Sequence, residues 1–274
     1  MSLFLRRRGV VAGGVFVPII ATGGQTTEDV INGEVFRWHA FKSVGSSSFV
    51  VSSVEGASDP TLDYYVVGGG ASGSKNNRTG AGGAAGGTRE GSLVATVTSY
   101  TITVGGGGAA ISGSNTPGQN GGTSSAFGET TGATNQQLNE GVSGNGFTSA
   151  AGATRTGFFS RGGGGACANS NGFIGGAGCV WPLITPTAAA ALGVGQVSGA
   201  SVFFGGGGGG GQSGGDGSRS PGGVGGGGAG NAGGSAALAG LANSGGGGGG
   251  GSVQAGGNSG AGGTGVVLVR YRIE

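Results

Sequence analysis

One pentapeptide in the chain has the residue types of a hydrolase nucleophile. Residues 211–215 read Gly-Gln-Ser-Gly-Gly and fit the G-x-S-x-G pattern, in which a sharp strand-to-helix turn exposes a serine hydroxyl for attack. The general base would have to be His39, which is the only histidine and lies far from Ser213 in the sequence. Because 77 of the 274 residues are glycine, such a pattern is expected by chance, and no strand-turn-helix context surrounds it. We therefore expect no catalytic residues, and we expect that the protein is not an enzyme.

Patterns for phosphate and metal binding are incomplete as well. Gly73-Ser74-Lys75 approaches a phosphate-binding loop, but the Gly-Lys-Ser/Thr order is absent and the lysine comes one place late. One histidine, two cysteines and 11 scattered acidic residues offer no cluster with the spacing of metal ligands. We expect neither a cofactor nor a metal ion.

Runs of glycine are the dominant feature of the chain. The longest clear run, 205–211, follows Phe203 and Phe204, and shorter or similar runs occur at 68–70, 105–108, 162–165, 225–228 and 245–251. In a polyproline-II helix, with three residues per turn, glycine lets neighbouring backbones come into contact. We interpret the runs as rods of a polyglycine-II bundle joined by N–H···O=C bonds. A flexible linker or disordered tail is the alternative, but apolar groups rather than charges separate these glycines.

Strand-like segments lie on both sides of the glycine-rich part. Residues 35–41, 48–51, 62–67 and 100–104 are rich in β-branched and aromatic residues. In 266–273 the apolar side chains alternate: Val267, Val269, Tyr271 and Ile273 share one face, and Leu268, Arg270 and Arg272 share the other. We predict an all-β fold, a small antiparallel β-sandwich that holds a bundle of glycine-rich polyproline-II helices with irregular loops. The rods would leave the sheet after Val67 and Val104.

The N-terminal residues and the net charge indicate which kinds of partner the protein has. The apolar stretch before Gly24 is too short to span a bilayer, so we expect no membrane insertion. The net charge is only +2 and no basic stripe is present, which excludes a typical nucleic-acid partner. We predict that residues 1–30 dock on other proteins of an assembly.

The order of strands and glycines also resembles a known family. Ser-Phe-Val-Val at 48–51, Tyr-Tyr-Val-Val-Gly-Gly-Gly at 64–70 and Tyr-Thr-Ile-Thr-Val with four glycines at 100–108 are similar to the glycine-rich domain of bacteriophage tail fibres and minor tail proteins. Residues 121–128 and 261–271 resemble its second part and its closing strand. The resemblance implies a virion structural protein near the fibre tip that meets the host. In the related polyglycine-II adhesins, loops between glycine rods determine receptor choice.

These observations divide the chain into four parts. We expect a docking segment at 1–30, a sandwich base with a first glycine excursion at 31–104, the polyglycine-II bundle at 105–264 and a closing strand at 265–274. Residues 157–204, with Cys167 and Cys179, do not fit the family pattern. The two cysteines could form a disulfide that braces this loop, but two buried thiols are the favoured state for a particle assembled in a reducing cytosol.

Specificity must come from the side chains that interrupt the rods, because glycine rods are nearly uniform. Exposed aromatic side chains with a nearby arginine are usual anchors of recognition. We single out Trp181 as the first candidate for a receptor or subunit contact. The other candidates are Phe158, Phe159, Arg161, Phe203 and Phe204. The alternative for Phe203 and Phe204 is that they seal the end of the bundle.

Three functions remain. The first is a bacteriophage tail fibre or receptor-binding tip, made in the host cytoplasm and incorporated in the virion, that attaches to a bacterial surface receptor. The second is a virion decoration or tail-connecting protein without receptor contact. The third is an ice-binding polyglycine-II protein, although its interruptions are irregular and aromatic. We expect a homo-oligomer, a trimer being common among fibres, because open sheet edges invite pairing.

Overall fold

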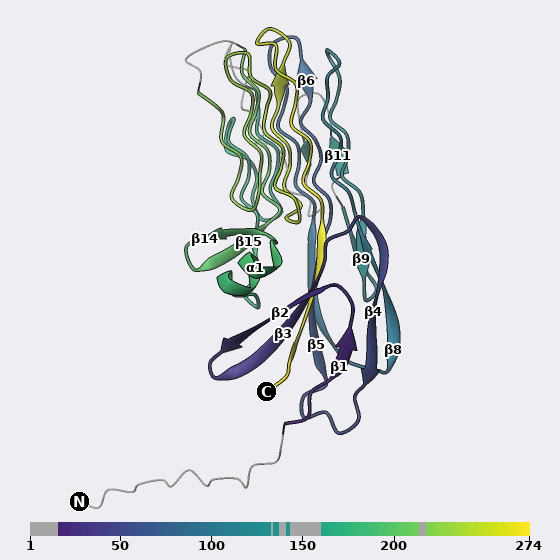
Figure 1. The fold of residues 1–274 in the computed structure, drawn as a ribbon. Helices are drawn as coiled ribbons and strands as arrows, with labels where there is room; N and C mark the ends of the chain where they lie inside the picture. The colour runs from purple at the N-terminus through teal and green to yellow at the C-terminus, as the bar shows by residue number, and fades with distance from the viewer. Residues whose placement is uncertain (1–15, 133, 137–140, 143–159, 214–217) are drawn as a thin grey trace, which may run out of the picture.

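The computed structural model describes residues 16–132, 134–136, 141–142, 160–213 and 218–274. Strands gather at one end of an elongated molecule, and the glycine runs extend side by side from them towards the other end (Figure 1). The C-terminus lies at the end that holds the strands. The chain therefore returns to its base after its longest glycine-rich excursion.

Two five-stranded antiparallel sheets form the base. The first has the order β1-β4-β8-β9-β10, with bounds Ile20–Thr22, Gly45–Ser53, Thr98–Val104, Ser124–Ala126 and Glu129–Thr131. The second has the order β2-β3-β17-β5-β7, with bounds Gln25–Ile31, Glu34–Phe41, Val266–Arg272, Thr61–Val67 and Thr88–Val94. Neighbouring strands in both sheets run antiparallel. The closing strand β17 lies in the centre of its sheet.

The core of the sandwich lies between these two sheets. Phe49 and Ile102 of the first sheet pack against Leu62, Val267 and Val269 of the second, and all five are fully buried. The alternation expected in 266–273 is confirmed, since the odd-numbered residues 267, 269 and 271 face this core. Burying large apolar side chains contributes roughly 1.5–3 kcal/mol each, so this end is stabilised by side-chain packing.

A compact insert covers the opposite face of the second sheet. It comprises β13 (Cys179–Val180), α1 (Pro186–Leu192), β14 (Gln196–Ser198) and β15 (Ser201–Phe204), with the three strands in one small sheet. Thr185 caps α1 by accepting a hydrogen bond from the Ala188 amide, and Gly193 ends the helix at a φ of 66°. The insert adds a third layer beside β2 and β3 (Figure 1).

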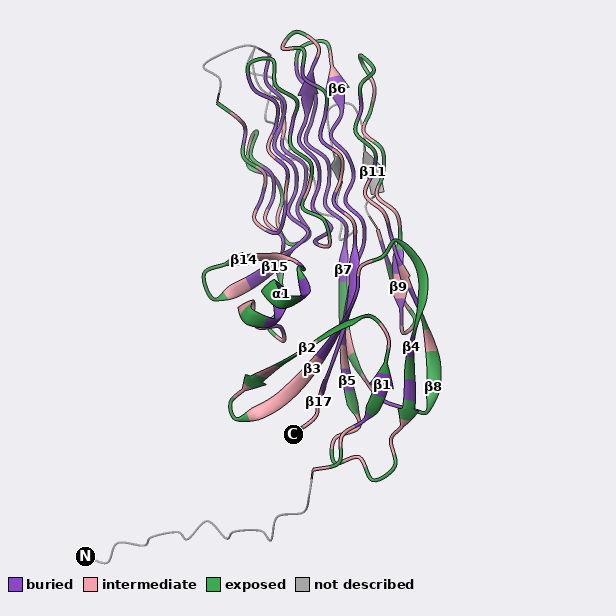
Figure 2. Cartoon of the chain, in the orientation of Figure 1, coloured by how far each residue is buried: buried purple, intermediate pink, exposed green. Residues whose placement is uncertain are grey.

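The glycine runs form the other half of the molecule, and backbone hydrogen bonds join them laterally. They occupy most of 68–87, 105–123, 160–178, 205–211 and 220–265. Two short strands, β6 (Lys75–Asn76) and β16 (Gly251–Ser252), pair in parallel within it, and β11 (Thr134–Gln136) pairs with β12 (Gly141–Val142). Most of the inner runs are buried (Figure 2). Buried backbone must be paired, and here other glycine runs supply the partners.

The structure confirms an all-β fold and refines its divisions. The runs leave the sheet after Val67 and Val104, as predicted. The sandwich begins earlier than expected, because β1 and β2 already belong to its sheets. The segment 105–264 is also not one bundle, since β9 and β10 extend the first sheet and 179–204 forms the insert. Among the described residues, no helix has the length and apolar character needed to cross a membrane.

Candidate functional site

The run 205–211 is the centre of the glycine-rich half. The amides of Gly208 and Gly211 donate to Gly83 O at 2.8 Å and Gly80 O at 2.7 Å. Both acceptors belong to one neighbouring run, so the same neighbour is met again after three residues. The amides of Gly207 and Gly210 repeat this with a second neighbour, at Gly176 O and Phe173 O.

Hydrogen bonds connect this run to neighbours on every side. Besides 80–83 and 173–176, its partners lie in 160–166, 220–223, 225–231 and 244–250. The Gly163 and Gly223 amides, for example, donate to Gly208 O and Gly207 O, each at 2.8 Å. An extended segment in a pleated sheet has partners on two sides only. The glycine half is therefore cross-linked in three dimensions and is not a layered sheet.

The close approach of the runs explains why they consist of glycine. A Cβ on Gly208 would lie 2.0 Å from Gly248 O, and one on Gly210 would lie 1.9 Å from Ser160 O. Those oxygens are backbone atoms that cannot rotate away. Gly106 differs, because its added Cβ would meet only the Val44 side chain at 3.6 Å. Large side chains are therefore excluded from the interior of the runs, where the buried non-glycine residues are small ones such as Ala71, Ser72 and Ala84.

The loops that join the runs meet at the end away from the sandwich. Backbone hydrogen bonds join three of these loops there, at 75–79, 112–117 and 252–257. Lys75 forms a β-bridge with Thr116, and the Gln254 amide donates to Asn77 O at 3.1 Å. The Asn77 amide also donates to Asn115 Oδ1 at 3.1 Å. We call this set, together with loop 231–236 and the described residues 218–220, the tip. It is a single surface made by segments far apart in the sequence.

Three basic residues, Lys75, Arg78 and Arg219, lie at the tip. Lys75 is only 8% exposed, and its Nζ donates to Ser112 O at 3.1 Å and Asn258 Oδ1 at 2.9 Å. Arg219 Nη1 donates to Gly230 O at 3.0 Å and Ala236 O at 2.9 Å. Arg78 is exposed. The phosphate-loop-like Lys75 therefore bridges two loops. The sequence analysis did not single out Arg78 and Arg219, although they are among the few charged residues that interrupt the glycine-rich segments.

The burial of Trp181 contradicts its expected role in receptor contact. Its side chain is 1% exposed, and its ring stacks on Tyr65 with centroids 5.3 Å apart and planes at 6°. Phe204 is fully buried beside the same tyrosine, at 5.3 Å between centroids. Burial raises the pKa of the Tyr65 hydroxyl, which keeps it neutral. These aromatic side chains attach the insert to the second sheet. The sequence analysis mistook this internal surface for an exposed loop.

The remaining candidates have separate positions. Phe203 is half-buried in β15, where it pairs with Val180 and Gln196, and so belongs to the insert rather than to the tip. Arg161 is half-buried at the end of a glycine run, where its carbonyl accepts from the Gly82 amide at 2.9 Å. Phe158 and Phe159 lie outside the described residues. Of the four candidates that the structure describes, Trp181, Phe203 and Phe204 belong to the insert, and Arg161 lies apart at the end of a glycine run.

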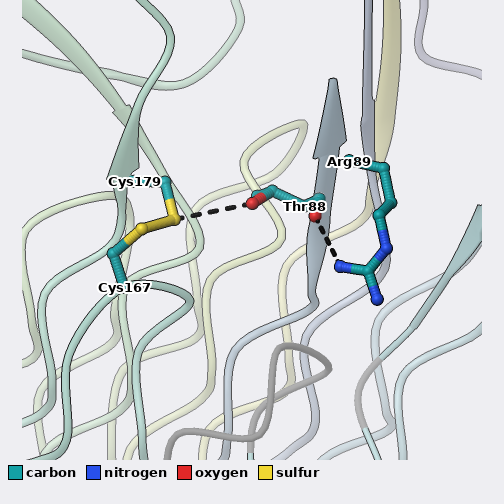
Figure 3. The surroundings of a disulfide bond; sticks show 4 residues. All are labelled: Thr88, Arg89, Cys167 and Cys179. Carbon is teal, nitrogen blue, oxygen red and sulfur yellow. Dashed lines mark hydrogen bonds between the residues drawn. A yellow bond between two sulfur atoms is a disulfide. The ribbon is translucent and has the colours of Figure 1, made fainter. Parts of the chain in front are cut away.

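The two cysteines form a disulfide, so the expectation of free thiols is wrong. Cys167 ends one glycine run and Cys179 begins β13 at the end of another, and the Cys167 amide donates to Ala177 O at 3.2 Å. Thr88 Oγ1 donates to Cys179 Sγ at 3.5 Å, and Arg89 Nη1 donates to Thr88 O at 2.8 Å (Figure 3). The bond therefore fixes the insert to the glycine runs close to β7.

The histidine and the serine of the hydrolase-like pattern lie in different parts of the molecule. His39 is buried in β3, where its Nδ1 donates to Gly23 O at 2.6 Å and its Nε2 lies 3.2 Å from Tyr271 Oη. Burial lowers the pKa of His39, and the nearby charge of Arg37 lowers it further. Ser213 follows the run 205–211 in the other half. The described residues also hold no group of three His, Cys, Asp or Glu side chains suited to a metal ion.

Comparison with known families agrees with the glycine-rich architecture. The sequence model of a family described as a glycine-rich domain matches residues 44–272, a range that holds the glycine runs, the insert and the strands of both sheets except β1, β2 and β3. No curated protein matches the sequence.

Proposed function

We propose that this chain, which belongs to the glycine-rich domain family, is a structural protein of a bacteriophage virion that contacts the host surface at the end of a tail fibre. The ordered strand-to-glycine junctions at Val67 and Val104 support this proposal. The three-dimensional hydrogen bonding around the run 205–211 carries it, because this bonding makes a stiff projecting body. Stiffness suits a protein that must hold recognition loops away from a particle.

The same bonding supports a polyglycine-II arrangement of the runs. The partner of an amide recurs every third residue, as the three residues per turn of a polyproline-II helix require. At about 3.1 Å per residue, seven glycines would span roughly 22 Å. A bundle of such rods needs no side chains for its interior. The loops at the tip can then vary without affecting the interior.

The two ends of the molecule differ in structure, which supports a position at the end of a fibre. The C-terminus and the sandwich lie at one end, and the tip lies at the other (Figure 1). We propose that the sandwich end, with the N-terminal segment, joins other virion proteins and further copies of this chain. Edge strands β2 and β7 are available positions for such pairing. The first half of the segment expected to dock, 1–15, lies outside the described residues, and the second half contributes β1 and most of β2 to the sandwich.

Binding of the purified chain to cells tests this function. The full chain with a fluorescent label is incubated with a panel of bacterial strains, and an antibody against it is applied to phage particles that infect the strain that binds. We expect saturable binding to cells and decoration of the fibre ends. Decoration of particles without cell binding would favour a tail-connecting or decoration protein. Absence of both, with inhibition of ice recrystallisation, would favour the ice-binding alternative.

A further inference from the structure

Acidic and basic residues are distributed unequally between the two halves. Every acidic residue that the structure describes lies in or beside the sandwich: Glu28, Asp29, Glu34, Glu55, Asp59, Asp63, Glu90, Glu129 and Glu274. The described glycine runs and their loops hold only basic charges: Lys75, Arg78, Arg161 and Arg219. The sequence also holds Arg155, Glu140 and Asp216, which lie outside the described residues. The described part of the glycine-rich half is therefore positive overall.

The basic residues of the two halves also differ in their partners. In the sandwich, Arg37, Arg270 and Arg272 form ion pairs with Glu28, Asp63 and Glu34. At the tip, Lys75 and Arg219 donate to neutral carbonyl and amide oxygens instead. Neutral partners fix a cationic side chain in place but leave its charge uncompensated. The tip thus keeps a positive field, and the sandwich cancels much of its own.

Arg78 is the tip residue best placed to meet a ligand. It is exposed, and its guanidinium has no hydrogen-bond partner among the described residues. Its backbone is fixed, since Arg78 O accepts a short hydrogen bond from Ser252 Oγ. A guanidinium offers five donors in a planar fork that matches phosphate and carboxylate groups. Asn77 precedes it in the same loop, and Asn115 lies on the neighbouring loop, where its Oδ1 accepts from the Asn77 backbone amide; neutral amide side chains suit hydroxyl-rich ligands.

We propose that the tip binds an anionic glycan of the bacterial surface, with Arg78 paired to its phosphate or carboxylate groups. This inference rests on the proposed function and adds the chemical class of the receptor. The positive charges of the tip are few and are separated by amides and hydroxyls, whereas nucleic-acid surfaces carry dense basic stripes. A glycan with occasional acidic groups among hydroxyls fits this spacing of charge.

Binding to defined glycans tests the inference. The full chain is passed over immobilised phosphate-bearing lipopolysaccharide, the same material after dephosphorylation or after reduction of its carboxyl groups, neutral dextran, and duplex DNA. The variants are Arg78→Gln, which removes the charge, and Arg78→Lys, which keeps the charge but not the fork. Arg89→Gln, at an exposed residue of β7 away from the tip, is the matched control. Unchanged thermal melting of each variant shows that it is folded.

We expect binding to the anionic glycan that weakens with added salt, and little binding to dextran. Arg78→Gln should weaken it roughly tenfold, as loss of a charge-assisted hydrogen bond does, with a smaller loss for Arg78→Lys and none for Arg89→Gln. Loss of binding after dephosphorylation identifies phosphate as the bound group, and loss after reduction of the carboxyl groups identifies carboxylate. Equal binding by Arg78→Gln, equal binding to dextran, or preference for DNA would overturn the inference.

Cell adsorption by the same variants separates this inference from the proposed function. If the wild-type chain adsorbs to cells and Arg78→Gln adsorbs equally well, the receptor is not recognised through this charge, and only the inference fails. If no variant adsorbs to any strain, the proposed function fails as well.

Discussion

The two halves of this molecule are held together in opposite ways. In the sandwich, large side chains such as Phe49 and Ile102 fill the space between sheets. In the glycine-rich half, backbones occupy that space, and a Cβ on Gly208 would lie 2.0 Å from a carbonyl oxygen. Hydrophobic burial stabilises the first half, and satisfied backbone hydrogen bonds stabilise the second. The comparison shows that a buried interior can be specified by the absence of side chains.

The largest effect is expected for Gly208→Ala in the centre of the glycine runs. The new methyl group would overlap Gly248 O, which itself accepts from the Gly83 amide at 2.7 Å. Because that oxygen is fixed, we expect a loss of more than about 5 kcal/mol in the free energy of unfolding, or failure to fold. Chemical denaturation measures this.

Gly106→Ala is the matched control for this substitution. Its Cβ would meet only the Val44 side chain at 3.6 Å, an ordinary contact. We expect a change within about 0.5 kcal/mol. Equal tolerance of alanine at positions 106 and 208 would contradict the close packing of the runs.

A smaller effect is expected in the sandwich. Phe49→Ala removes a fully buried ring that contacts Phe41, Tyr100 and Phe127, and should cost about 3–5 kcal/mol. The neighbouring Val50→Ala, on the exposed face of β4, is the control and should change little. Denaturation followed by tryptophan fluorescence reports on this half, because Trp38 belongs to the second sheet and Trp181 packs against that sheet. A loss below 1 kcal/mol would show that the sandwich core does not stabilise the protein.

Loss of the disulfide should have a moderate effect. The bond between Cys167 and Cys179 closes a loop of sequence separation 12, so its removal should lower stability by about 2–3 kcal/mol. The measurement is the urea midpoint with and without a reductant. Cys167→Ala should show the lower midpoint and no response to the reductant. A wild-type urea midpoint that is the same with and without the reductant would mean that the disulfide does not constrain the chain.

Acidification should have the smallest effect. Burial lowers the pKa of His39 below the value of about 6.5 that holds for an exposed histidine, so the unfolded chain binds the proton more readily. The stability from neutral His39 is complete above pH 6.5 and is lost as the pH falls from there through the lower folded pKa. His39→Gln should flatten the dependence of stability on pH between 7 and 5. An unchanged slope in this variant would assign that dependence to other groups.

The sequence predicted the parts of the fold that depend on local pattern. Alternation in 266–273 predicted a strand with Val267, Val269 and Tyr271 on one face, and the junctions at Val67 and Val104 marked the strand ends. The stacking of Trp181 on Tyr65 could not be predicted, since it depends on how an insert with no repeat pattern folds back. The disulfide was missed for a related reason, because two glycine runs bring its cysteines together.

The role of the loops between the runs in recognition stays a prediction. Loops between the runs were expected to carry specificity, and the structure gathers several of them in one tip. The aromatic side chains chosen first belong to the insert, because an aromatic residue beside glycines looks exposed in a sequence. The three basic residues of the tip could have been noticed in the sequence, because Lys75, Arg78 and Arg219 are among the few charged residues that interrupt the glycine-rich segments.

Hydrogen exchange at the amides of residues 205–211 tests the central claim most directly. Nearly all of these amides donate to neighbouring runs, so we predict protection comparable with that of β17 in the sandwich. Peptide-resolved exchange under native conditions can compare the two segments in one sample. Exchange of 205–211 at the rate of an unstructured peptide, while β17 stays protected, would contradict the account.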